Sequence, residues 1–304
     1  MATKTSLLGL TKPAYTDPAD VAVMNNNFDM IDRAMGNGKR VENLLGNSDF
    51  SATRFIAQAG LNGLHDTTLY LGDRWRGHAS ITATQQAHGM LLTSVATAAY
   101  IHQKVQVKAG QTYTLAIYAT ERTGGHRIAV YDSGIKTNVA QAQATDRDLL
   151  VVSFAATEDT MAMLYYPGWA TGGGSAVLQW AALYEGAYTA DTLPAYTYKG
   201  YAAELAECQR YFVRVLAQPV NGWSYAWDRV TMFVPLPVPM RTASPTIVLK
   251  SASSNYYIGA TSYAATLKNI LSVGNGMLVY FSHTSTVSGQ CVMPEFAADF
   301  IDDL

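Results

Sequence analysis

The chain has few charged residues. Lys, Arg, Asp and Glu make up 14% of its 304 residues, against about 25% in ordinary soluble proteins. With 21 basic and 23 acidic residues the net charge is −2, so the chain lacks the basic surface that a general nucleic-acid binder needs. Its 49% hydrophobic content excludes intrinsic disorder. The surface must therefore be built from uncharged polar residues and from tyrosine, which occurs 19 times.

Cysteine is also scarce, since the chain contains only Cys208 and Cys291. Two cysteines in a chain of this length cannot form a disulfide scaffold, and no second Cys or His stands at zinc-ligand spacing from either one. We therefore expect two free, buried thiols. No cofactor is expected. A structural calcium ion bound by Asp49 and neighbouring carbonyl groups is the alternative, although no acidic loop supports it.

Long hydrophobic runs are missing. No apolar stretch reaches the roughly 18 residues of a membrane-spanning helix, and residues 90–101, which come closest, are interrupted by Thr and Ser. The first ten residues, MATKTSLLGL, contain one Lys and an apolar core that is too short for a secretory signal. We expect a protein that is made in the cytoplasm and does not insert into a membrane.

Known catalytic motifs are absent as well. The chain has no GxSxG, HExxH, Walker or dinucleotide-binding motif, and its histidines form no pair at i, i+2 or i, i+4 spacing. The neighbouring carboxylates Asp146 and Asp148, like Glu158 and Asp159, are typical of turns between strands. A glycosidase needs two carboxylates roughly 5–10 Å apart, an arrangement that the sequence does not exclude. We expect no catalytic residues and keep an enzyme as the alternative.

One helix is predicted near the start of the chain, at residues 18–35. Asp17 can cap it, Pro18 suits the first helical position, and Asp20 would lie in the first turn. Two heptads are too short to be stable alone, so the apolar seam of this helix needs a partner, either copies of itself or another protein. The alternative is a helix that lies on its own domain. The seam, with alternating spacings of three and four, consists of Val21, Met24, Phe28, Ile31 and Met35.

The remainder of the chain consists mostly of strand and turn signals. From residue 43 to about 187, short apolar segments alternate with turns, and no helix intervenes. This pattern predicts an antiparallel β-sandwich or jelly roll. A connector helix at 201–211 then precedes a second set of strands. The predicted fold is mainly β, with a short N-terminal helix, an antiparallel β-sandwich or jelly roll, a connector helix and a C-terminal β domain.

The same pattern divides the chain into four segments. They are an N-terminal attachment segment at 1–42, the sandwich at 43–190, a linker with the connector helix at 191–212, and the C-terminal β domain at 213–304. In the connector helix, Cys208 shares an apolar face with Leu205 and Phe212, whereas Glu204 is predicted to lie away from that face.

Aromatic residues gather at three places between predicted strands. The group at 223–227 puts three large rings at alternate positions, which on a strand would share one face. Flat rings stack on the apolar faces of sugars, while amide and hydroxyl groups take the sugar hydroxyls. The same rings could instead belong to the core or to a subunit interface. The candidate glycan-binding residues are Trp223, Tyr225, Trp227, Tyr256, Tyr257 and Trp169.

Several segments together resemble proteins of phage and prophage tails. GLTKPAYTDPADVAVMNNNFDMID (9–32) resembles the segment that attaches such proteins to the tail. NLLGNSDF (43–50), GDRW (72–75) and AGQTYTLAIYA (109–119) are similar to their carbohydrate-binding-module-like jelly rolls. ALYEGAYTADTLPAY (182–196) looks like the closing strand, with Leu183-Tyr184-Glu185 where the family commonly has Leu-Glu. ELAECQRYF (204–212) and FVPLPVPMRTASPTIVL (233–249) resemble the connector and the start of the terminal β domain of many tail fibres.

The resemblance covers nearly the whole chain in the same order. It implies a tail fibre or receptor-binding protein of the virion tail, a homotrimer whose N-terminus binds other tail or baseplate proteins and whose C-terminus is distal. It implies no catalytic residues. The expected function is attachment to a host-surface glycan, and the alternatives are a purely structural tail or baseplate protein and a polysaccharide depolymerase. Exposed aromatic clusters favour attachment, whereas clusters in interfaces favour the structural role.

Overall fold

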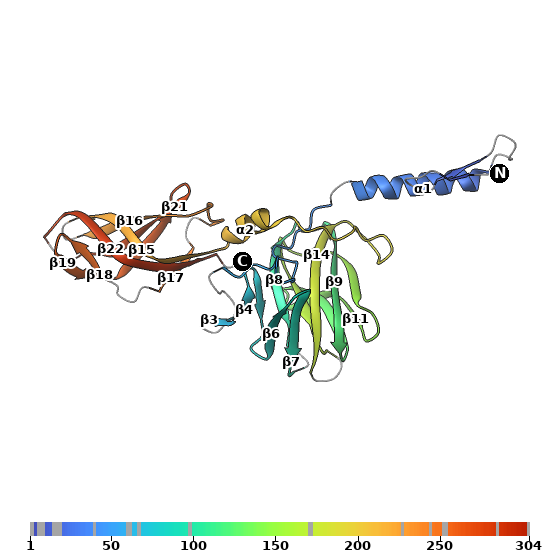
Figure 1. Ribbon diagram of the computed structural model, residues 1–304, viewed down its shortest axis with the longest axis horizontal. Helices are drawn as coiled ribbons and strands as arrows, with labels where there is room; N and C mark the ends of the chain where they lie inside the picture. Colours follow the sequence, from blue (N-terminus) through green and yellow to red (C-terminus); the bar gives the residue numbers. More distant parts are fainter. Residues whose placement is uncertain are drawn as a thin grey trace.

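The computed structural model of the chain consists mainly of β-strands (Figure 1). It describes residues 3–4, 10–13, 20–38, 41–58, 63–65, 68–96, 99–169, 173–225, 228–242, 245–250, 255–283 and 286–302. The helices in these residues are α1 (Val21–Gly38) and α2 (Tyr201–Gln209). The strands are β1 (Thr3–Lys4), β2 (Thr11–Lys12), β3 (Gly63–His65), β4 (Thr68–Gly72), β5 (Trp75–Gly77), β6 (Ile81–Gln86), β7 (Gly89–Ser94), β8 (Ile101–Gln106), β9 (Thr112–Thr123), β10 (His126–Asp132), β11 (Thr137–Ala144), β12 (Leu149–Ala155), β13 (Thr160–Tyr166), β14 (Gly174–Glu185), β15 (Phe212–Tyr225), β16 (Arg229–Pro235), β17 (Thr246–Leu249), β18 (Asn255–Ile258), β19 (Thr261–Ala264), β20 (Leu267–Ser272), β21 (Gly276–Ser282) and β22 (Gly289–Ile301).

The N-terminal helix begins later than the sequence predicts. Its first residue is Val21, and Asp20 caps it through a side-chain hydrogen bond of 2.8 Å from the main-chain N–H two residues further on. Asp17 and Pro18, the predicted cap and first helical residue, lie outside the described residues. The helix runs to Gly38, three residues beyond its predicted end. No helix in the described part of the chain combines the length and the hydropathy that crossing a bilayer requires.

The apolar seam of α1 is exposed in the single chain. In Figure 1 the helix projects away from the sheets, and Val21, Met24 and Phe28 are 68%, 50% and 60% exposed. Ile31 is half-buried, and the side chain of Met35 lies outside the description. A row of large apolar side chains is unfavourable in water. The seam therefore needs a partner from outside this single chain.

Two antiparallel sheets between β3 and β14 form the predicted β-sandwich. One sheet has the strand order β11-β10-β13-β8-β5-β4-β3, and the other has the order β12-β9-β14-β7-β6 (Figure 1). Strands far apart in the sequence lie side by side, as in a jelly roll. Because side chains alternate between the two faces of a strand, each sheet contributes one face to a common core that includes Trp75, Leu115 and Met163. The other face of each sheet is available for other contacts.

The segment that enters the sandwich is held by a buried asparagine. Asn47 has a φ of 52°, a left-handed conformation that asparagine tolerates better than most residues. Its Nδ2 donates to the carbonyls of Ile56 and Asp73 at 2.8 Å each, and its Oδ1 accepts the Ile56 N–H at 2.8 Å. The Trp75 indole donates to its carbonyl at 2.9 Å. These bonds satisfy polar groups that would otherwise be buried without partners.

The linker after β14 packs on the five-stranded sheet and leads into α2. Tyr196 stacks on Trp180 with 5.0 Å between ring centroids, and Trp180 stacks on Tyr118 at 5.7 Å. In α2 the side chain of Glu204 is buried, contrary to the prediction, because its carboxylate accepts the N–H of Asn47 at 2.6 Å. Burial raises the pKa of Glu204 above its ordinary value. This bond fixes α2 against the sandwich.

A second polar contact joins the sandwich to the start of β15. The Gln58 side-chain amide donates to Asp73 at 2.7 Å and to the carbonyl of Phe212 at 2.9 Å, while its main-chain N–H donates to Asp73 at 2.8 Å. Burial raises the pKa of Asp73 to about 6, against the opposing effect of these donors. Nearby, the Arg74 guanidinium lies 3.4 Å from the centre of the Tyr211 ring.

The strands after α2 form one antiparallel sheet that curls around its own core. The strand order is β19-β18-β22-β15-β16-β21-β20, and β17 also pairs with β22 (Figure 1). The core contains Met232, Val279 and Phe281, and it is separate from the sandwich core. Cys208 and Cys291 are both buried and free, as predicted. The domain limits proposed from the sequence remain predictions.

Candidate functional site

The outer face of the seven-stranded sheet carries a groove, here named the sheet groove. Its volume is about 470 Å³, and its lining comes from β8, β10, β11 and β13 and from the residues next to them. In one row across the sheet, Tyr131 and Lys104 flank Ala162; in the next row, Leu164 lies beside His102. Ala162 and Leu164 line the groove between these longer side chains. The short side chain of Ala162 between Tyr131 and Lys104 leaves the space of the groove in that row.

Aromatic rings form a continuous series that begins in the lining of the sheet groove and ends at Trp169, which lines the second pocket described below. The ring centroids of His102 and Tyr100 are 5.6 Å apart, those of Tyr100 and Tyr166 are 5.4 Å apart, and those of Tyr166 and Trp169 are 5.7 Å apart. The rings meet edge-to-face or tilted, the arrangements that aromatic quadrupoles favour. Tyr100, Tyr131 and Trp169 are half-buried, so part of each ring faces solvent.

Arg127 closes the ring series at its Trp169 end. Its guanidinium carbon lies 3.4 Å from the centre of the Trp169 ring and 4.1 Å from that of Tyr166. The side chain is buried, and its Nη1 lies 3.4 Å from Oε1 of Gln141. Because the cation covers one face of Trp169, a ligand can reach this ring through its edge or its other face only.

The polar lining of the sheet groove is amide, hydroxyl and lysine. Asn138, Ser133, Lys104 and Lys136 all line it, and in the described part of the chain neither lysine forms an ion pair. Burial, with a smaller effect of nearby cations, lowers the pKa of His102 to about 4. His102 is therefore neutral at pH 7. Rings beside hydrogen-bonding groups suit a ligand that has both apolar faces and many hydroxyls.

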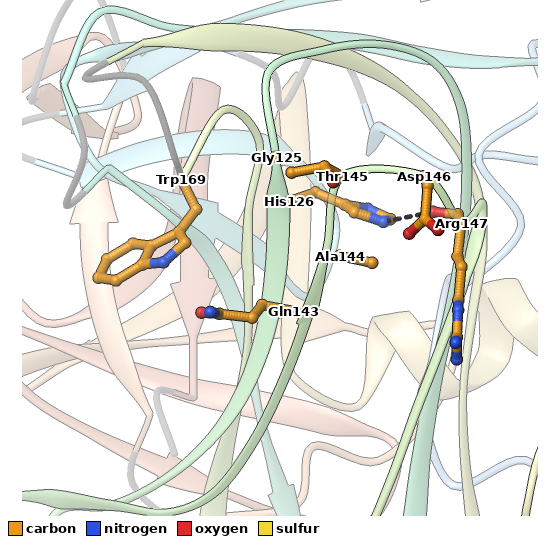
Figure 2. Close-up of a pocket in the computed structure, with 8 residues that line it drawn as sticks. All are labelled: Gly125, His126, Gln143, Ala144, Thr145, Asp146, Arg147 and Trp169. Atoms are coloured by element: carbon orange, nitrogen blue, oxygen red, sulfur yellow. Dashed lines mark hydrogen bonds between the residues drawn. The ribbon is translucent and has the colours of Figure 1, made fainter.

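A second pocket, here named the end pocket, lies where β10 begins and β11 ends (Figure 2). Its volume is about 440 Å³. In Figure 2 the Trp169 ring and the Arg147 side chain lie on opposite sides of it, with the Gln143 amide between them. His126 donates through Nε2 to the Arg147 carbonyl at 2.8 Å, and its Nδ1 is 3.4 Å from the Tyr165 hydroxyl. Burial lowers the pKa of His126 to about 4, so it supports the wall as a neutral ring.

Two of the predicted rings lie on the outer face of the C-terminal sheet, here named the C-terminal face. Trp223 and Tyr225 are 47% and 45% exposed, and Ser224 between them is buried. The Arg229 guanidinium lies 5.3 Å from the Tyr225 ring centre and 5.8 Å from that of Tyr280. A depression of about 350 Å³ on this face is lined by Arg229, Lys268, Asn269, Leu271 and Tyr280.

The remaining predicted rings do not form one group. Tyr256 is 1% exposed, its hydroxyl donates to Nδ1 of His283, and its ring stacks on Tyr263 at 5.5 Å. The prediction that Tyr256 contacts a glycan is therefore wrong, because this side chain belongs to the core. Tyr257 is half-buried and points to the opposite side of β18, since neighbouring residues of a strand face opposite ways. Trp227 lies outside the described residues.

The sheet groove contains residues that the sequence did not single out, and the predicted ring Trp169 lines the end pocket instead. Tyr100, His102 and Lys104 come from β8 and the residue before it, whereas Tyr131 comes from β10. One signal was present in β8, where the apolar Ile101 and Val105 enter the core and the residues between them alternate outward. Such alternation identifies the outward residues of one strand but not their neighbours on other strands.

The residues near Asp49 do not fit a calcium ion. One carboxylate oxygen of Asp49 accepts the Ser51 hydroxyl at 2.7 Å and the Ser51 N–H at 3.2 Å. The other oxygen accepts Nη1 of Arg54 at 2.9 Å. The Arg54 guanidinium binds the carboxylate where a metal ion would have to bind. Both oxygens of Asp49 therefore already have partners within the protein. Among the described residues, no three His, Cys, Asp or Glu side chains gather as a metal site.

The carboxylates considered for catalysis hold turns and strand ends. Asp148 forms an ion pair with Arg122 at 2.8 Å, and Glu158 accepts the N–H and the hydroxyl of Ser133 at 2.9 and 3.1 Å. Asp146 is exposed at the rim of the end pocket (Figure 2). The hydrogen bonds of Asp148 and Glu158 explain these two residues as structural groups.

Comparisons with known proteins give no family. No family model and no curated protein sequence matches the chain. Similar solved structures include one described as "CBM4 structure and function" (14% identity, 49% of this chain and 98% of that chain covered, TM-score 0.30). Another is the CBM22-1-CBM22-2 tandem domain of Paenibacillus barcinonensis Xyn10C (9% identity, 87% and 98% covered, TM-score 0.31). A third is the arabinose-bound MgGH51 α-L-arabinofuranosidase (13% identity, 56% and 30% covered, TM-score 0.32). Likeness this low assigns no function.

Proposed function

We propose that the chain binds carbohydrate through the sheet groove and serves as a receptor-binding protein of a phage tail. The observation that supports binding is the groove itself, in which aromatic rings, the short side chain of Ala162 and polar groups share one outer sheet face. Its volume of about 470 Å³ falls in the range of small-ligand sites. The proposed activity is binding without catalysis.

The chemistry of a sugar ring matches the two kinds of groups in the sheet groove. Each pyranose has apolar C–H faces, which stack on flat rings such as Tyr100 and Tyr131. Its hydroxyls lie around the edge, where Asn138 and Ser133 can donate and accept hydrogen bonds. Because the rings are held by their neighbours before a ligand arrives, little conformational entropy is lost on binding.

The C-terminal face supplies a second aromatic surface in this proposal. Trp223 and Tyr225 are the predicted rings placed there above, and both reach solvent in the single chain. Phe233 and Leu271, which also lie on the outer side of this sheet, are 47% and 44% exposed. Such aliphatic and phenyl side chains suit a subunit interface as well as a glycan. A purely structural role of this face is therefore the second candidate.

Assembly in the tail is proposed from α1. Its exposed seam fits a parallel bundle of copies of the chain, and the tail resemblance gives three as their number. The N-terminal segment would then bind other tail or baseplate proteins, with the C-terminal face distal. Antibodies against the chain should label the tails of particles that contain it, and labelling absent from tails would contradict the virion assignment.

Binding is tested with a polysaccharide panel that includes bacterial surface glycans, using affinity electrophoresis of the full chain. Tyr100→Ala and Tyr131→Ala should each weaken binding by about tenfold, which corresponds to about 1.4 kcal/mol. Tyr201→Ala, which removes an exposed ring at the start of α2, is the matched control and should bind normally. Thermal unfolding of each variant separates lost binding from lost folding.

Four outcomes distinguish the candidates. Loss of binding in Tyr100→Ala supports the sheet groove as the site, and loss in Trp223→Ala supports the C-terminal face. If the chain binds no glycan and its assembly depends on Trp223, the result supports the purely structural role. A fall in polymer length during incubation would instead indicate a depolymerase.

A further inference from the structure

We propose that the sheet groove selects acidic saccharides, with Lys104 and Lys136 binding an anionic substituent of the sugar. The inference rests on the proposed glycan binding and names the class of glycan. Its basis is the charge of the lining, which is cationic and contains no carboxylate.

The two lysines stand at the edges of the groove and are free to pair with a ligand. Lys104 lies in the same row of the sheet as Ala162 and Tyr131, and Lys136 lies in the turn that leads into β11. Neither forms an ion pair with the described residues. Lys136 is exposed, whereas Lys104 is half-buried, and an ammonium group that is only partly hydrated gains most from an anionic partner.

Carboxylates close to the groove are already bound and do not neutralise these lysines by contact. Glu158, which reaches Ser133 of the lining, accepts two hydrogen bonds from that residue at 2.9 and 3.1 Å. Asp132 is 3% exposed and accepts the N–H of Ile135 at 3.0 Å and the hydroxyl of Thr157. The carboxylates of Glu158 and Asp132 are therefore both engaged in hydrogen bonds within the protein.

A third observation concerns the electrostatic potential inside the groove. Arg76 and Lys104 both act against protonation of His102, in addition to the larger effect of its burial. Arg76 lies opposite His102 in the strand register, and Lys104 lies two residues further along the same strand on the same face, so two cations stand near that ring. The same positive potential that disfavours an imidazolium favours an anion. In a chain whose net charge is −2, this is a local feature of one face and not a general property.

The test compares polymers that differ only in charge. Affinity of the full chain is measured for polygalacturonate and for its fully methyl-esterified form, which has the same sugars without the charge. Dextran sulfate and dextran form the second pair and distinguish a sulfate from a carboxylate. We expect about tenfold tighter binding of at least one charged polymer over its neutral form at 50 mM salt, and a smaller ratio at 300 mM salt.

Variants locate the effect. Lys104→Gln/Lys136→Gln should remove the preference for the charged form, while Lys108→Gln, an exposed lysine outside the groove lining, should keep it. Equal affinity for charged and neutral forms, or a preference that survives in the double variant, would overturn the inference. If Tyr100→Ala still weakens binding in that case, the proposed glycan binding stands without the preference for charged sugars. Absence of binding to every charged polymer would also overturn it, and binding to neutral glycans then decides the proposed function separately.

Discussion

The Arg127 guanidinium lies over the Trp169 ring, with 3.4 Å between its central carbon and the ring centre. The same cation lies 4.1 Å from the centre of Tyr166, so one buried side chain holds a ring of the sheet groove and a ring of the end pocket. A planar guanidinium can stack on both rings, and a lysine ammonium cannot. The position of Trp169, and with it one wall of the end pocket, therefore depends on Arg127.

Arg127→Lys should lower the free energy of unfolding by roughly 1 kcal/mol, because it keeps the charge and loses the stacking. Arg229→Lys is the matched control, since that arginine is exposed and lies 5.3 Å from Tyr225. It should cost less than about 0.5 kcal/mol. Urea denaturation of both variants measures the difference, and equal effects of the two substitutions would contradict a special role for Arg127.

His126 should make the protein less stable in acid. Its pKa is about 4 in the folded protein because burial disfavours the imidazolium, whereas the unfolded chain takes up this proton near 6.5. The stabilisation is present above pH 6.5 and is lost as the pH falls toward 4. His126→Gln keeps a donor for the Arg147 carbonyl and does not titrate.

We expect the wild type to lose roughly 2 kcal/mol relative to His126→Gln between pH 7.5 and 4.5. Urea denaturation at both pH values measures this change. The exposed His88 provides a control, because His88→Gln should change stability equally at the two pH values. A parallel pH dependence of wild type and His126→Gln would show that His126 is not the group responsible.

Asp73 should act in the opposite direction. Burial raises its pKa to about 6 from about 3.8, so the folded protein holds this proton more tightly than the unfolded chain. The stabilisation is complete below pH 3.8 and is lost as the pH rises through 6. Between pH 4 and pH 7 the wild type should lose roughly 2 kcal/mol relative to Asp73→Asn.

The same variant also tests the joint between the sandwich and β15. Asparagine cannot accept both Gln58 donors, so Asp73→Asn should be less stable than wild type at pH 4. Asp146→Asn, an exposed carboxylate, is the control. Hydrogen exchange at Phe212 and its neighbours should speed up in Asp73→Asn only, and unchanged exchange there would argue against a role of Asp73 in this joint.

Phe28→Glu should separate the proposed trimer into single chains. Phe28 is 60% exposed on the seam of α1, and three carboxylates brought together there would repel one another. Asn25→Glu adds the same charge off the seam and should leave the trimer intact. Sedimentation velocity distinguishes the two states, and a wild type that sediments as a monomer would overturn the proposed assembly.

The strand pattern could be predicted where side chains alternate clearly, and it could not where they do not. β11 has a weak strand signal in the sequence, because its run of Gln and Ala contains one large apolar side chain, Val139. The length of β15 is equally hard to predict, since Pro219 and two irregularities of register interrupt a strand of 14 residues. β22 runs to Ile301, where it pairs with Phe212.

The binding surfaces show a similar division. Alternation along β15 is a local property, so Trp223 and Tyr225 could be placed on one face from the sequence. The adjacency of Tyr256 and Tyr257 was misleading, because a strand turns neighbouring side chains to opposite faces. Trp169 was selected as a ring, but nothing near it in the sequence indicated Arg127 as its partner.

What local chemistry could establish was therefore the mainly β class, the antiparallel sandwich and the buried free thiols of Cys208 and Cys291, since hydropathy and side-chain alternation act over a few residues. The tertiary structure alone decided which rings and cations share a surface. Tyr100 meets Tyr166, and Tyr131 lines the same groove, because β13 pairs with both β8 and β10, and that order depends on contacts between segments far apart in the chain. Sheet order is a property of the whole fold, and the groove follows from it.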